Sequence, residues 1–119
     1  MEKLNTMQQK CKLNDVYRNG EPGPGGAYHD YTIVSADGKQ ILEHIEFQKG
    51  PRNDPGSRHG VLECDLLEIV RDRLTHFQYG PFACEENARA LRHITEALYQ
   101  INLRTENRIE RGVLGTMNP

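Results

Sequence analysis

Hydrophobic and polar residues alternate in two stretches of the first half of the chain, and this period of two predicts β-strands. YHDYTIVS, residues 28–35, is rich in aromatic and β-branched residues, and its Tyr31 and Ile33 alternate with polar neighbours. Asp37-Gly38 supplies a turn signal, and KQILEHIEF, residues 39–47, returns with Ile41, Ile45 and Phe47 on one face. The pattern therefore predicts a β-hairpin.

The apolar spacing changes to a helical period after residue 60. In VLECDLLEIVRDRLTHF, residues 61–77, apolar residues recur every three or four positions, which predicts a helix with one apolar face. From Ala83 onward the apolar steps alternate between three and four, a narrow seam typical of paired helices. The YGP turn, 79–81, separates the two predicted helices, and Gly112 ends the second at about Arg111.

These patterns predict an α+β fold in which a small antiparallel β-sheet precedes a long antiparallel helical hairpin. The sheet contains the hairpin 28–47, and because a lone hairpin is only marginally stable, Val16-Tyr17 or a second subunit should add a strand. We expect a single domain over residues 1–119, since this length is close to the usual domain size. Its expected parts are a fraying N-terminal arm 1–15, a sheet part with loops 16–60, the helical hairpin 61–111 and a tail 112–119.

The sequence Phe-Gln-X-Gly-Pro occurs twice, at 47–51 and 77–81. The first copy ends a predicted strand and the second ends a predicted helix. An internal repeat would reproduce the flanking elements as well, so we interpret both copies as turns that stop an element. The second copy is followed directly by the aromatic Phe82.

Composition narrows the class of protein. An apolar fraction of 36%, no Trp and a mean hydropathy of −0.74 allow only a thin core, so we expect a homo-oligomer. A net charge of −2 gives no general attraction to nucleic acid. The sequence contains neither a membrane-spanning apolar run nor the apolar region of a signal peptide. Three cysteines without a CxxC pair indicate a reducing, cytosolic compartment.

Two residues near the turn between the helices each have two open interpretations. Phe82 either caps the core of the helical hairpin or offers a platform for a ligand ring, since stacking on a base contributes ~1–3 kcal/mol. Asn87 lies on the apolar seam, where it either fixes the register of the helices or hydrogen-bonds a polar ligand edge.

Three arginines follow one face at the other end of the second helix. Arg104, Arg108 and Arg111 are separated by four and three residues, and guanidinium groups bind phosphate or pyrophosphate through paired donors. A solvated, salt-bridged helix end is the alternative. Phe82 and Arg108 are about 39 Å apart along a helix, so a small ligand could contact both only in an antiparallel dimer.

Catalysis and metal binding have little support in the sequence. The five histidines show neither H-x3-H nor HExxH spacing, so we expect no metal site. No Ser or Cys nucleophile accompanies a suitable base, and the PGPGG loop lacks the GKS or GKT of a phosphate-binding loop. His76 and Asp72, four residues apart on one helix, more often form a surface salt bridge than an acid–base pair. We therefore expect neither an enzyme nor a cofactor.

Most of the chain, residues 26–116, resembles the phage Thoeris anti-defence sponge proteins of the first type described, which share a helical-hairpin domain with anti-CBASS sponges. The stretches that carry this resemblance most specifically are FQYGPFACEEN, 77–87, and RTENRIERGVLGT, 104–116. GAYHDYTI, IEFQKGPR and LLEIVRDRL precede them. In the family pattern an Arg precedes the Glu-Asn pair, whereas this chain has Glu85 there, so one local positive charge is absent.

The resemblance implies a homo-oligomer built from dimers that acts in the cytoplasm of the infected bacterial host without catalysing a reaction. Such proteins trap the cyclic ADP-ribose isomers, among them glycocyclic ADP-ribose, that activate the Thoeris effector, and they release them unchanged. Some also bind cyclic di- or trinucleotides at separate sites between subunits. An enzyme that degrades the signal, or a structural or nucleic-acid-binding phage protein, remains the alternative.

The resemblance also implies roles for residues of this chain. It places Phe82 against the adenine, Asn87 against polar ligand edges, and the arginines of a second copy against the pyrophosphate. The remaining expected contacts are Thr116 and Met117, which would close the pocket from the tail, and Arg58, which would serve the second type of site.

Overall fold

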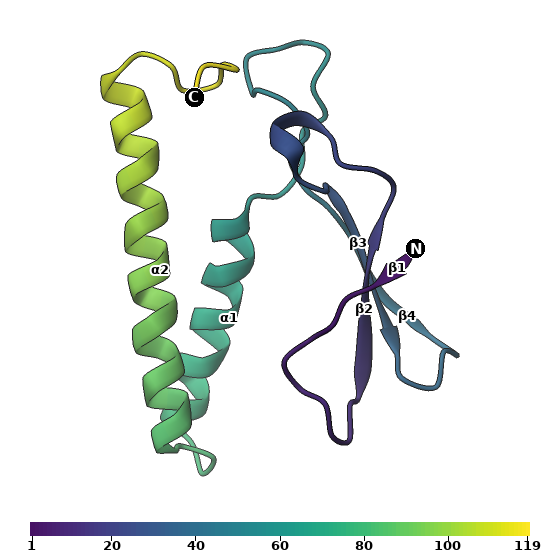
Figure 1. Ribbon diagram of the computed structural model, residues 1–119. Coiled ribbons are helices and arrows are strands. Elements are labelled where there is room, and N and C mark those ends of the chain that lie inside the picture. Colours follow the sequence, from purple (N-terminus) through teal and green to yellow (C-terminus); the bar gives the residue numbers. More distant parts are fainter. The chain divides into compact units, whose positions relative to one another are not determined.

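The computed structural model describes all 119 residues, which form two compact units. Unit 1, Met1–Val61, holds the strands, and unit 2, Leu62–Pro119, holds the two helices (Figure 1). The predicted α+β order, a sheet followed by a helical hairpin, is confirmed. That the two units make a single domain stays a prediction.

Unit 1 is built on a four-stranded antiparallel sheet with the strand order β1-β2-β3-β4 (Figure 1). β3 and β4 form the predicted hairpin, and β2 is the predicted additional strand at Val16-Tyr17. A single 3-10 turn, Pro24–Gly26, lies in the Gly/Pro-rich loop between β2 and β3. The strand bounds are β1 Glu2–Lys3, β2 Asn14–Asn19, β3 Asp30–Ser35 and β4 Ile41–Glu46.

The expectation of a frayed arm over residues 1–15 is corrected at its start. β1 pairs antiparallel with β2, where Lys3 lies opposite Tyr17. The guanidinium of Arg18 donates to the carboxylate of Glu2, and this contact raises the pKa of Arg18. Backbone pairing and this ion pair hold β1 in the sheet. The sequence did not predict this strand, because two residues are too few to show an alternating pattern.

The core of unit 1 is thin and lies on one face of the central strand β3. Thr32 and Val34 are the only buried residues of the whole chain. Tyr31 and Ile33, the residues of β3 that the alternation singled out, lie on the other face and are half-buried. On that face the ring of Tyr31 packs edge-on against Phe47, with 5.6 Å between the ring centroids. Within unit 1, both faces of β3 therefore carry side chains that are at least half-buried.

Unit 2 is the predicted antiparallel helical hairpin, made of α1, Glu63–Gln78, and α2, Glu85–Glu110. At the start of α1 the carboxylate of Asp65 accepts the Leu62 N–H at 2.8 Å, which satisfies one unpaired donor of the first turn. α2 ends before Gly112, whose φ of 70° is in the left-handed region that glycine tolerates. No helix of the chain is both long and apolar enough to cross a membrane.

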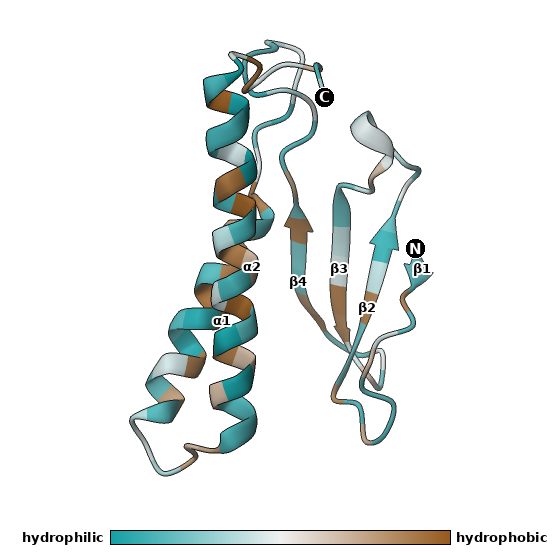
Figure 2. Cartoon of the chain, turned by 60° about the vertical axis from the view of Figure 1, so that its left-hand side comes forward, coloured by the Kyte–Doolittle hydropathy of each residue, from teal (hydrophilic) through white to brown (hydrophobic).

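Apolar residues recur along both helices at the predicted spacing (Figure 2). Leu91, Ile94 and Leu98 of the α2 seam are half-buried, but unit 2 contains no fully buried residue. Ile69 of α1 and Tyr99 of α2 keep more than half of their surface exposed. The hairpin therefore leaves much apolar surface in contact with solvent when it is a single copy.

Candidate functional site

The loop 79–84, which contains Phe82, joins α1 to α2 at one end of the hairpin, and Figure 1 shows this connection. Phe82 keeps 73% of its surface exposed, so within one chain it does not cap the core of the hairpin. Tyr79, in the same loop, is also exposed, and its ring lies edge-on to that of His76. Two exposed aromatic rings in one loop offer apolar surface that a ligand or a partner could cover.

The backbone of this loop is held by its own flanking residues. The side-chain amide of Gln78 accepts the Cys84 N–H at 3.0 Å and donates to the Cys84 carbonyl at 3.1 Å. Asn87 donates to the carbonyl of Phe82 at 3.5 Å. Gly80 N–H donates to the Phe77 carbonyl at 3.1 Å. An exposed aromatic residue thus lies in a loop whose ends are joined by hydrogen bonds, and Asn87, predicted to contact a ligand, donates the longest of them.

The other end of α2 carries Arg108, which folds the tail back onto the helix. Its Nη1 donates to the Asn118 carbonyl at 2.8 Å, and its Nη2 donates to the carbonyls of Val113 and Thr116 at 2.9 and 3.2 Å. Three of its five N–H donors are therefore directed at main-chain oxygens of residues 113–118. A phosphate that takes two adjacent donors of Arg108 has to displace part of this tail.

The neighbouring predicted residues lie at the same end of α2. Arg111 donates from Nε to Asn107 at 2.8 Å and from Nη1 to the main-chain oxygen of Pro119 at 2.9 Å. Arg104 is exposed and lines a shallow groove on α2. Thr116 donates to the Val113 carbonyl, and Met117 is exposed. The predicted arginines and tail residues are thus brought together, whereas Phe82 lies at the opposite end of a helix about 39 Å long.

Arg58 ties the loop between β4 and α1 to the sheet. Its Nη1 donates to Asp30 at 3.0 Å, and its Nη2 donates to the carbonyls of His29 and Phe47 at 3.2 and 3.0 Å. Its Nε is buried without a hydrogen-bond partner, 3.9 Å from a carboxylate oxygen of Glu46. These contacts give Arg58 a structural role in unit 1. Its contact with a second class of ligand stays a prediction.

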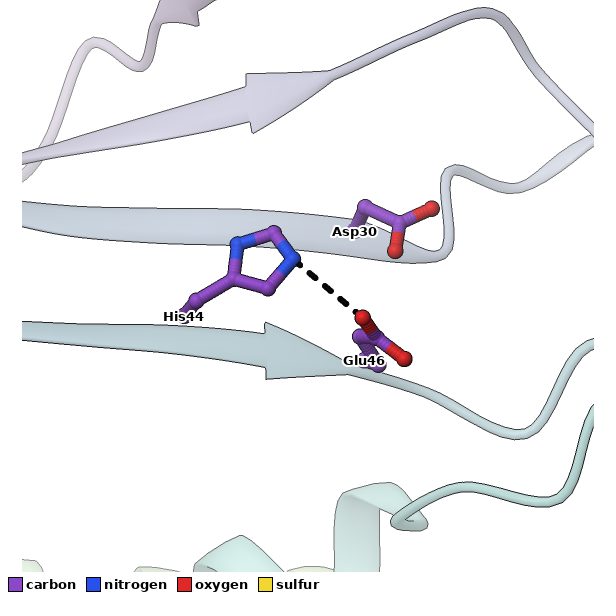
Figure 3. Close-up of side chains that lie close together, drawn as sticks. All are labelled: Asp30, His44 and Glu46. Carbon is purple, nitrogen blue, oxygen red and sulfur yellow. Dashed lines mark ion pairs between the residues drawn. The ribbon is translucent and has the colours of Figure 1, made fainter.

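Sequence reasoning missed a cluster of charged side chains on β3 and β4, made of Asp30, His44 and Glu46 (Figure 3). Their potential ligand atoms all lie within 4.8 Å of one another, and His44 Nε2 is 3.5 Å from a Glu46 oxygen. Such a set could hold a divalent cation. However, Arg58 already pairs with both carboxylates, and its positive charge opposes a second cation, so we interpret the cluster as an ion-pair network.

Part of this cluster had a signal in the sequence, because His44 and Glu46 are two residues apart on one strand and therefore share a face. The position of Asp30 opposite Glu46 depends on the register of the hairpin and is known only from the structure. A second missed feature is a shallow groove between α1 and α2, whose lining residues come from both helices. They are Arg71, Thr75, Leu91, Arg92, Thr95 and Glu96.

His76 and Asp72, the pair considered for acid–base chemistry, are exposed. His76 Nδ1 lies 3.6 Å from a carboxylate oxygen of Asp72, and both side chains keep more than two thirds of their surface exposed. His76 Nδ1 is also 2.8 Å from the main-chain carbonyl of Asp72. A solvated pair in which the ring already contacts its own helix is typical of a surface ion pair.

The fold and the sequence around the tip define the class of protein. Residues 39–106, more than half of the chain, match the family model described as Acb2/Tad1, hairpin domain, and the chain belongs to this family. This confirms the predicted resemblance. The matched region contains Arg58, Phe82, Asn87 and Arg104, whereas the tail with its contacts to Arg108 lies beyond it.

A curated relative is Thoeris anti-defense 1 of Bacillus phage SBSphiJ7. It is 42% identical to this chain over 94 residues, which cover 79% of this chain and 64% of the relative. The chain therefore spans less than two thirds of the length of that protein.

Proposed function

We propose that this chain is a phage anti-defence protein that binds and sequesters cyclic ADP-ribose isomers, such as glycocyclic ADP-ribose, without cleaving them. Removal of the free signal would keep the Thoeris effector of the infected bacterium inactive. The proposal includes cyclic di- and trinucleotides as a second class of ligand, and it places the protein in the cytoplasm of the host. The family match and the name of the relative support the anti-defence role.

One observation carries the choice of ligand. Phe82 is largely exposed, yet it projects from a loop whose main chain is held on both sides. An exposed ring is accessible to a ligand, and a loop held by hydrogen bonds presents that ring in one position. A flat, fixed aromatic surface suits a nucleobase such as the adenine of the signal.

The phosphate side of the ligand requires a second copy of the chain. The pyrophosphate needs cationic donors, and Arg104, Arg108 and Arg111 supply them at the far end of α2. Because that end is about 39 Å from Phe82, we propose a homo-oligomer built from antiparallel pairs, in which the tip of one copy meets the tail of the other. The uncovered apolar residues of the hairpin support such an association.

A capture-and-release experiment tests the proposal. The protein is mixed with a cyclic ADP-ribose isomer, unbound ligand is removed, the protein is denatured by heat, and the supernatant is analysed by chromatography. We expect intact signal to be recovered from the denatured protein. A converted product would show that the protein is an enzyme, and a protein that retains and converts nothing would refute binding of this ligand.

A further inference from the structure

The two copies of Phe-Gln-X-Gly-Pro make the same kind of contact through their glutamine side chains, and this contact explains why both copies contain Gln. In the first copy the side-chain amide of Gln48 accepts the Gly60 N–H at 3.2 Å and donates to the Gly50 carbonyl at 3.2 Å. In the second copy the amide of Gln78 accepts from the N–H of Cys84 and donates to its carbonyl. In both places one side chain bridges two main-chain groups across the loop that follows it.

We propose that Gln78 is a positioning residue for ligand capture: its two hydrogen bonds to Cys84 fix the loop 79–84 so that Phe82 presents its ring in the orientation that the ligand requires. Gln78 is the last residue of α1, and Cys84 directly precedes α2. The clamp therefore closes the loop at both of its ends and leaves Phe82 exposed between them. This inference rests on the proposed stacking role of Phe82.

The physical reason is the cost of ordering a loop. A free loop samples many conformations, and a ligand that needs one of them must meet the cost of restricting the others. Gln78 is half-buried, and its amide supplies the acceptor and the donor that match the N–H and the carbonyl of Cys84. The cost is thereby met during folding instead of during binding, which raises affinity without any contact between Gln78 and the ligand.

The first test is the Gln78→Met variant, which keeps the length of the side chain and removes both hydrogen bonds. We expect binding of glycocyclic ADP-ribose, measured by titration calorimetry, to weaken about tenfold, or ~1.4 kcal/mol. Hydrogen exchange should speed up at the Cys84 amide and stay unchanged in the middle of α2. The matched control is Gln48→Met, which removes the equivalent clamp in unit 1 and should leave this affinity unchanged.

The second test uses Gln78→Glu, whose affinity should depend on pH. A neutral carboxyl group has a donor and an acceptor in the positions of the amide, whereas a carboxylate cannot donate to the Cys84 carbonyl. The affinity of this variant relative to the natural protein should therefore be low at pH 7 and recover as the pH falls through about 4.3, the ordinary pKa of Glu. A relative affinity that is constant over this range would overturn the inference.

The Phe82→Ala variant separates the inference from the function on which it rests. If Phe82→Ala loses binding and Gln78→Met binds as tightly as the natural protein, the positioning role is wrong and the proposed function stands. If Phe82→Ala binds normally, the stacking role fails and the inference fails with it.

Discussion

Truncation of Phe82 should separate capture of the ligand from stability of the fold. Phe82 keeps 73% of its surface exposed, so the alanine variant removes an aromatic ring that contributes little to the packing of its own chain. Its main-chain carbonyl, which accepts from Asn87, is retained. The variant therefore changes the ring and leaves the loop that carries it in place.

The magnitudes follow from the exposure of the ring. Full burial of a Phe side chain stabilises a protein by ~1.5–3 kcal/mol, and about a quarter of Phe82 is buried, so the free energy of unfolding should fall by less than about 1 kcal/mol. Stacking on a base contributes ~1–3 kcal/mol, so the affinity for a cyclic ADP-ribose isomer should fall by about 5- to 150-fold.

The assay combines titration calorimetry, urea unfolding and size-exclusion chromatography on the same preparation. Phe77→Ala is the matched control, because Phe77 is only 37% exposed and lies under the guanidinium of Arg73 at 5.1 Å. It should lose about 1–2 kcal/mol of stability and keep most of its affinity. The reasoning is refuted if Phe82→Ala loses its oligomer or its stability, since the ring would then be a packing residue.

Three further predictions concern the loops and the tail. Gly60→Ala should lower the free energy of unfolding in urea by about 1–3 kcal/mol, because the added Cβ would lie within 2.7 Å of three main-chain atoms. Gly56→Ala in the same loop is the control and should change this free energy by less than about 0.5 kcal/mol. Equal effects of the two variants would contradict the prediction. Asp37 has a lowered pKa, chiefly because it accepts the Ser35 hydroxyl. The natural protein should be more stable than the Asp37→Ala variant at pH 7, and this advantage should be lost as the pH falls below about 3.9 and through the folded-state pKa of Asp37. If the difference between the urea midpoints of the two proteins stayed the same at every pH, the prediction would be wrong. Arg108→Ala should weaken binding of the signal by a few kcal/mol and raise hydrogen exchange in residues 113–118; an unchanged affinity would exclude Arg108 from the site.

The helices were predictable because a long amphipathic pattern leaves few alternatives. The second helix was expected from Ala83 to about Arg111, and it runs from Glu85 to Glu110. β1 could not be predicted, since two residues are too few to show a period, and their pairing depends on a distant strand. The irregular register between Ile33 and Val34 also has no signature in the sequence.

The sequence indicated which residue types could form the candidate site. It did not indicate what these residues contact or how exposed they are. An aromatic residue at a turn is compatible with packing or with display, and only the fold shows that Phe82 is exposed. The partners of Arg108 are main-chain carbonyls, which every sequence possesses, so their position depends on the path of the tail. The hydrogen bonds of Gln78 across its loop could have been suspected from the sequence, because the same Phe-Gln-X-Gly-Pro occurs twice.

The unbroken length of α2 has a consequence for stoichiometry. In the proposed antiparallel pair, each end of the paired helices makes one pocket, and a helix of 26 residues separates the two by about 39 Å. Electrostatic effects are screened over about 8 Å at physiological salt, so an occupied pocket does not alter the charge felt at the other. The pockets should fill independently, with one signal molecule per chain. The amount of signal removed would then rise in direct proportion to the number of chains that the phage produces.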